Sequence, residues 1–69
     1  MIKNDLRAKR EKHGKGISQA QLAKAVGVSR FYISKIENQR SRPNAELMLK
    51  IARYLGYKVE DIFELEDEE

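Results

Sequence analysis

The stretch SQAQLAKAVGVSRFYISKIE, residues 18–37, predicts two short helices joined by a sharp turn. Ser18 stands at an N-cap position, and Gln21 follows at the spacing of a capping box. Gly27 ends the first helix, because glycine adopts positive φ without a steric penalty. Ser29 is the N-cap of the second helix. The caps and the glycine therefore fix both helix starts and the turn between them.

Apolar residues give each of these two helices one face to bury. Leu22 and Val26 are one helical turn apart on the first helix, and Ile33 and Ile36 share a face of the second. Two capped helices joined by a short turn that contains glycine match the helix-turn-helix motif. Whether the motif reads DNA depends on the rest of the chain.

Three more helices and a short terminal ribbon are predicted outside this stretch. Asn4 or Asp5 can cap the first helix, and Asn44 can cap the fourth. The predicted elements are helices over about 5–13, 45–55 and 57–62, and strands over 1–3 and 63–66, where apolar and acidic residues alternate. We therefore expect one all-α, five-helix domain over residues 1–66 that allows a small two-stranded β-ribbon, followed by an acidic disordered tail at 67–69.

The composition limits the kinds of protein to which the chain can belong. It has no cysteine and one histidine, His13, so neither a disulfide nor a metal site is expected. No apolar run is long enough to span a membrane, and the N-terminus lacks the apolar core of a signal peptide. An enzyme is disfavoured, because no acid/base constellation is present. We expect a soluble cytoplasmic protein without a cofactor.

The net charge of +3 hides a strong asymmetry along the chain. Residues 1–58 hold all 14 Lys and Arg against four acidic residues, a balance of +10, whereas residues 59–69 carry seven acidic residues and no basic one. A basic body favours an anionic partner such as nucleic acid, and a solvated basic surface is the plainer alternative. The acidic end is read as a solubilising segment.

The outer face of the helix over residues 30–37 is unusual for a surface that only meets water. It presents two aromatic rings and two cations, and its members are Arg30, Phe31, Tyr32, Ser34 and Lys35. An exposed cluster of this kind usually contacts a partner. The alternative is that Phe31 or Tyr32 packs on a neighbouring helix.

The helix over residues 45–55 has more apolar residues than one buried face needs. Its predicted core stripe is Ala45, Met48, Ile51, Ala52 and Leu55, which leaves further apolar residues outside that stripe. The excess predicts either a fifth element or a second subunit. The candidate residues for a dimer interface are Leu47, Tyr54, Val59, Ile62, Phe63 and Leu65. The alternative is that they close the core of a single chain.

The ordered set of motifs resembles the phage repressor/Cro-like (Xre-type) helix-turn-helix regulators, in their small stand-alone form. The resemblance covers about residues 4–63. It rests on Arg10, SQxxLA from Ser18, VGVS from Val26, ISxIEN from Ile33, Arg42-Pro43 and LKIAxxLG from Leu49. None of these motifs is specific alone, but their order along the chain is.

The resemblance implies a role for each matching residue. The DNA-contacting positions are Gln19, Ser29, Arg30, Phe31, Tyr32, Ser34, Lys35, Arg40 and Arg42. Gln19, Arg40 and Arg42 fall where the family touches the phosphate backbone, and the others belong to the recognition helix. Arg10 and Glu37 fall at the positions of a partly buried ion pair. Arg10 also lies one turn after Leu6, on the buried side of its helix, where a charge needs a partner.

Two residues depart from the family pattern. Gln39 replaces the glycine that commonly follows Asn38, which leaves the conformation of the next loop open. Phe31 and Tyr32 stand where many relatives have small or amide side chains, so a simple amide-to-adenine contact is not expected.

The function expected from these observations is sequence-specific binding of double-stranded DNA. We expect a transcription regulator that acts as a repressor and binds a palindromic operator as a homodimer. The protein would be bacterial, archaeal or phage-encoded and associated with the nucleoid in the cytoplasm, and the sequence does not decide between repression and activation. The alternative is an antitoxin-type protein that binds a partner protein through its acidic tail and regulates its own operon.

Overall fold

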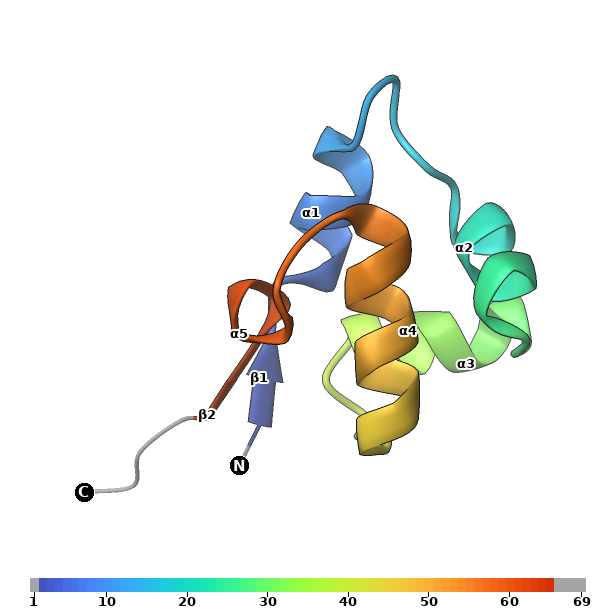
Figure 1. The fold of residues 1–69 in the computed structure, drawn as a ribbon. Helices are drawn as coiled ribbons and strands as arrows, with labels where there is room; N and C mark the ends of the chain where they lie inside the picture. The colour runs from blue at the N-terminus through green and yellow to red at the C-terminus, as the bar shows by residue number, and fades with distance from the viewer. Residues whose placement is uncertain (1, 66–69) are drawn as a thin grey trace.

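The computed structural model describes residues 2–65, which form five helices and two strands (Figure 1). In chain order these are β1 (Ile2–Asn4), α1 (Leu6–Lys12), α2 (Gln19–Val26), α3 (Arg30–Glu37), α4 (Ala45–Leu55), α5 (Val59–Ile62) and β2 (Phe63–Leu65). The predicted all-α fold with a small ribbon is confirmed. No helix among these residues is long and apolar enough to cross a membrane. The acidic tail predicted at residues 67–69 lies outside the described residues.

Side-chain caps fix the starts of the three central helices. Ser18, Ser29 and Asn44 each accept a hydrogen bond from the backbone N–H three residues later, at 3.0, 3.1 and 2.8 Å. Gly27 and Gly56 end α2 and α4 in the left-handed region, both at φ 79°. Each helix therefore begins and ends at the predicted residue, because these signals act within one turn of the chain.

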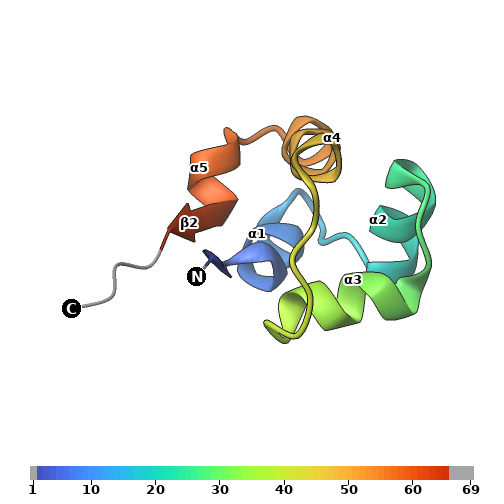
Figure 2. The same ribbon diagram turned by 90° about the horizontal axis from the view of Figure 1, so that it is seen from below.

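The core is formed by all five helices. Its fully buried large side chains are Leu6, Leu22, Ile33, Ile36, Ile51 and Ile62. α2 packs against both α3 and α4, while α1 contacts α3 and α5 contacts α4. Viewed from below, α3 lies along the edge of the molecule opposite α4 (Figure 2). Two isoleucines thus anchor α3 from one side and leave its other side uncovered.

Two details of the C-terminal half differ from the prediction. α5 begins at Val59 rather than Tyr57, because the Tyr57 N–H donates to Ala52 O at 2.9 Å and closes α4 instead. On α4 the buried stripe includes Leu47, whereas Ala45 is exposed just after the cap. The rest of the predicted stripe holds, because Ile51, Ala52 and Leu55 are buried and Met48 packs against the core.

The terminal ribbon is antiparallel and closes the two ends of the fold on each other. Ile2 lies opposite Leu65, and Asn4 lies opposite Phe63. The Asp5 N–H adds a bond of 2.8 Å to Ile62 O. The predicted ribbon is confirmed, with β1 shifted by one residue to Ile2–Asn4.

Asn4 ties this ribbon to the end of α3. Its Oδ1 accepts from the Leu6 N–H at 3.1 Å, which starts α1, and its Nδ2 donates to Ile36 O at 2.6 Å. The Gln39 amide completes the contact, because Oε1 accepts from Asn4 N and Nε2 donates to Asn4 O, both at 3.2 Å. Gln39 has φ 62°, a left-handed conformation that costs a non-glycine residue about 1–2 kcal/mol. These bonds hold it in that conformation. We call this set of contacts the Asn4–Gln39 clamp.

We predict that Asn4→Ala lowers the free energy of unfolding by about 1–2 kcal/mol, since it removes the side-chain bonds of Asn4 to the Leu6 N–H, to Ile36 O and to Gln39 Oε1. The bonds from the Gln39 amide to the backbone of residue 4 remain in this variant. Urea unfolding followed by circular dichroism measures the change. Lys3→Ala is the matched control, because Lys3 lies in the same strand with an exposed side chain and should change stability by less than about 0.5 kcal/mol. Equal stability of the two variants would contradict the role given to Asn4.

Candidate nucleic-acid interface

The outer face of α3 carries side chains that make few contacts with the rest of the described protein. Arg30, Phe31 and Lys35 are exposed, and the Phe31 side chain is 71% exposed. Ser29 caps the helix, so the first turn that carries Arg30 and Phe31 is held in place. Within the described residues Phe31 is one of only a few large apolar side chains open to solvent. The plainer alternative, packing on a neighbouring helix, does not hold for this ring.

Tyr32 and Ser34 lie closer to the body of the protein than the sequence suggested. Tyr32 is half-buried and packs against the core, so the packing alternative does apply to this ring. Ser34 is half-buried, and its Oγ accepts from Asn38 Nδ2 at 3.3 Å. Fewer side chains of α3 than predicted are therefore fully exposed to solvent.

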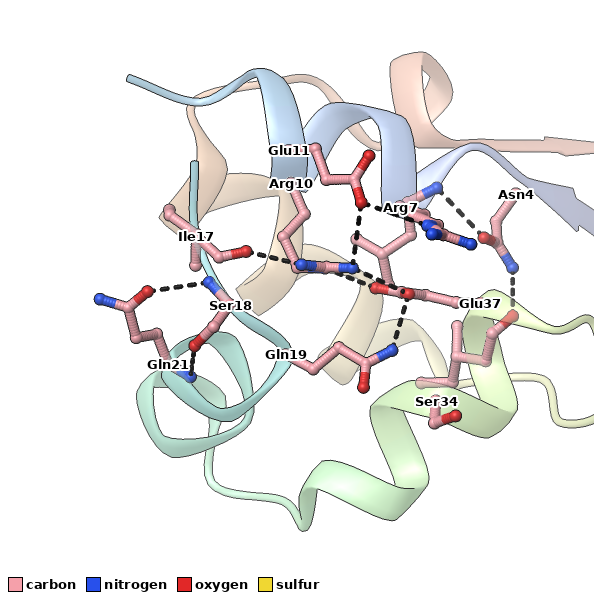
Figure 3. A network of polar contacts seen from close by, with 12 residues as sticks. Asn4, Arg7, Arg10, Glu11, Ile17, Ser18, Gln19, Gln21, Ser34 and Glu37 are labelled. Atoms are coloured by element: carbon pink, nitrogen blue, oxygen red, sulfur yellow. Dashed lines mark hydrogen bonds and ion pairs between the residues drawn. The ribbon is translucent and has the colours of Figure 1, made fainter. Parts of the chain in front are cut away.

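A buried ion pair joins α1 to the end of α3 (Figure 3). Arg10 Nε lies 2.7 Å from Glu37 Oε2, and Arg10 Nη2 donates to Glu37 Oε1 at 3.1 Å. The two side chains are only 9% and 4% exposed. Arg10 Nη1 also donates to Ile17 O at 2.7 Å, which fixes the entry into α2. The structure thus brings together the two residues expected to pair and adds the loop before α2 to them.

Gln19 belongs to the same network. Its Nε2 donates to Glu37 Oε1 at 2.9 Å, so the amide is turned toward the buried pair (Figure 3). The capping box beside it occupies the backbone N–H groups of Ser18 and Gln21. Gln19 therefore orients the start of α2 relative to α3, a structural role that the sequence did not reveal.

A shallow hollow of about 520 Å³ opens where α1, α2 and α3 meet. Its lining comprises Arg7, Arg10, Ser18, Gln19, Ala20, Arg30, Glu37 and Asn38. Arg7 and Arg30 are exposed cations beside the N-terminus of α2. The positive end of a helix dipole and the Arg7 guanidinium together suit a phosphate.

The loop after α3 carries two more cations. Arg40 and Arg42 are exposed, and the Arg40 N–H donates to Lys35 O at 2.8 Å. Gln39 sits between the end of α3 and this loop, where the Asn4–Gln39 clamp fixes its direction. The sequence showed that Gln39 replaces glycine, but it could not show that an amide from β1 compensates for the strain.

The six residues predicted for a dimer interface fall into three groups by burial. Leu47, Ile62 and Phe63 are buried in the core of the single chain, so the alternative reading applies to them. Val59 is half-buried against that core. Tyr54 and Leu65 remain 43% and 72% exposed. The surplus apolar residues of α4 and its neighbours are therefore mostly used within one chain.

We predict that Arg10→Met lowers the free energy of unfolding by roughly 3–5 kcal/mol, because Glu37 would remain buried without a charged partner. Thermal unfolding followed by circular dichroism measures this loss. Arg7→Met is the matched control on the same helix, since the Arg7–Glu11 pair is exposed and worth about 1 kcal/mol or less. A melting temperature of Arg10→Met close to that of Arg7→Met would contradict the importance of the buried pair.

Comparison with known proteins agrees with this geometry. A family model described as helix-turn-helix matches residues 6–62. A relative named as an uncharacterized HTH-type transcriptional regulator, MJ0272 of Methanocaldococcus jannaschii, is 44% identical over 68 residues, which are 99% of this chain and all of that one. The ImmF control region 10 kDa protein of Bacillus phage phi105 is 43% identical over 44 residues, 64% of this chain and 46% of that protein.

The solved structures include a similar protein as well. The crystal structure of the clp gene regulator ClgR from Corynebacterium glutamicum superposes with a TM-score of 0.74 at 36% identity. The match covers 81% of this chain but only 57% of the ClgR chain, so the present chain spans little more than half of that structure. The chain belongs to the Xre/Cro-like helix-turn-helix family of DNA-binding transcription regulators.

Proposed function

We propose that the chain binds double-stranded DNA sequence-specifically in the cytoplasm, with α3 in the major groove, and represses transcription by occluding its operator. The observation that carries the proposal is the uncovered side of α3, where Arg30, Phe31 and Lys35 project from a capped and anchored helix. The major groove admits an α-helix, and each of the four base pairs presents a different pattern of groups there. A helix in a fixed position that carries both polar and apolar side chains is therefore suited to this groove.

The side chains on α3 differ in what they can read. Arg30 can make two hydrogen bonds to guanine O6 and N7, whereas Lys35 offers a single charged donor to guanine or phosphate. Phe31 can contact a thymine methyl group. Tyr32 and Ser34 are half-buried, and their hydroxyl groups suit phosphates at the groove edge.

Groups close to α3 support contacts to the phosphate backbone. Arg7 and the N-terminus of α2 at Gln19 line the hollow beside α3, and Ser29 begins α3 itself. Arg40 and Arg42 lie in the loop that follows α3. Phosphate contacts of this kind set the register of α3 on the duplex without reading sequence.

A dimer would contact enough base pairs to recognise one DNA sequence specifically. One helix reads only a few base pairs, and two helices about 34 Å apart read the halves of a palindrome. We propose a homodimer formed through the exposed apolar residues Tyr54 and Leu65, together with Val59.

Selection of bound duplexes from a random pool, followed by sequencing, tests this function. We expect an enriched palindrome whose half-site centres are about one helical turn apart. Size-exclusion chromatography with light scattering reports the dimer separately. No enrichment would overturn the proposed function, and an enriched single half-site bound by a monomer would overturn the dimer alone.

We predict that Arg30→Ala weakens binding to the enriched site by about 1–3 kcal/mol and relaxes the preference at one base position, because it removes a bidentate contact. Repeating the selection with the variant shows which position is relaxed. Equal weakening on all sequences would instead place Arg30 on phosphate.

We predict that Arg42→Ala weakens binding to every duplex by a similar factor and lowers the slope of log K against log salt by about one unit, because one counterion fewer is released. Fluorescence anisotropy at several salt concentrations measures the slope. Lys58→Ala removes the same charge from the exposed connection between α4 and α5 and should leave the slope unchanged. If the two variants have the same slope, Arg42 does not contact phosphate.

A further inference from the structure

We propose that Arg30 and Phe31 act as one unit that reads a 5-methylpyrimidine followed by guanine, so that cytosine methylated at C5 replaces thymine at this step. The inference rests on the proposed function and names the DNA feature that α3 recognises. If it holds, methylation of a CpG step in the operator increases the affinity of the protein.

The first observation is the exposure of Phe31. Phe31 is 71% exposed although the core lies directly beneath α3, where Ile33 and Ile36 are fully buried. The neighbouring Tyr32 packs against that core, whereas Phe31 does not. A ring held in water on a capped helix costs solvation free energy that an apolar contact on a partner recovers.

The second observation is the position of the Arg30 guanidinium. Its Cζ lies 5.4 Å from the centroid of the Phe31 ring, within the range of a cation–π contact. The two residues occupy the first turn of α3, immediately after the Ser29 cap. The charged and the apolar tips are therefore already side by side before they meet DNA.

The chemistry of the two side chains selects the bases. A guanidinium matches guanine O6 and N7, which are both acceptors in the major groove. A phenyl ring has no hydrogen-bond donor or acceptor, so it senses the methyl group on C5 of the pyrimidine and not the oxygen or amino group on C4. On their major-groove edges thymine and 5-methylcytosine present the same methyl group and differ only at C4. Adjacent side chains on the helix thus suit adjacent base pairs, the pyrimidine under Phe31 and the guanine under Arg30.

The test uses the intact chain and the site enriched in the selection described above. At the pyrimidine–guanine step under α3, four duplexes carry thymine, uracil, cytosine or 5-methylcytosine, and anisotropy at constant salt gives each Kd. Thymine against uracil and 5-methylcytosine against cytosine are two comparisons that differ by one methyl group. We expect the methyl group to tighten binding about fivefold in both comparisons.

Three variants identify the residues responsible. Phe31→Ala should bring both methyl ratios to about one while the uracil duplex is still bound. Arg30→Lys should reduce the loss that wild type shows when the guanine is replaced by 7-deazaguanine, because lysine does not make the bidentate contact. Leu49→Ala is the matched control, since Leu49 is a 61% exposed apolar residue on α4 and should leave both ratios unchanged.

The outcomes separate this inference from the proposed function. If no sequence is enriched, the proposed function fails and this inference fails with it. If a site is bound tightly but has no pyrimidine–guanine step under α3, or both methyl ratios equal one, only the inference is overturned. A thymine effect without a 5-methylcytosine effect overturns it as well, because C4 would then be read. Equal gains in both comparisons, lost in Phe31→Ala, support it.

Discussion

The arrangement of the helix-turn-helix depends on one buried ion pair, Arg10–Glu37. Arg10 donates to Glu37 from α1 and to the Ile17 carbonyl, while Gln19 donates to the same carboxylate from α2. A buried charge is costly unless its partners satisfy it in good geometry, so this network holds only when α1, α2 and α3 have the native orientation. The pair therefore specifies how the helices meet, in a chain too short to rely on a large core.

The Arg10–Glu37 network helps to explain how one face of α3 can remain exposed to solvent. Ile33 and Ile36 hold its inner face, Glu37 fixes its end, and Ser29 fixes its start. A short helix held at both ends does not need a second layer of packing over its outer face. The cations and the exposed ring can then meet a partner without any rearrangement of the backbone, which lowers the entropic cost of binding.

The sequence predicted what is decided within a few residues. The caps Ser18, Ser29 and Asn44 set helix boundaries through bonds to the next turn, and those boundaries are correct. Contacts between distant residues were harder to foresee. The pattern could not show that Leu47 rather than Ala45 faces the core, nor that Asn4 would stabilise Gln39, because both outcomes depend on where the other elements lie. Among the candidate site residues, only the Arg10–Glu37 contact was foreseen across the fold, and it required the family resemblance.

The Asn4–Gln39 clamp also has a consequence for the order in which the protein folds. The helix-turn-helix is made of neighbours in the chain, whereas Asn4 and Gln39 are 35 residues apart and β1 meets β2 only when nearly the whole chain is in place. Contacts that close long loops form late, because chain entropy must be lost before they are gained. The loop that carries Arg40 and Arg42 thus acquires its final path after α2 and α3 have docked. A chain in which β1 has not yet paired with β2 would therefore have a formed α3 but a loop after it that lacks its final path.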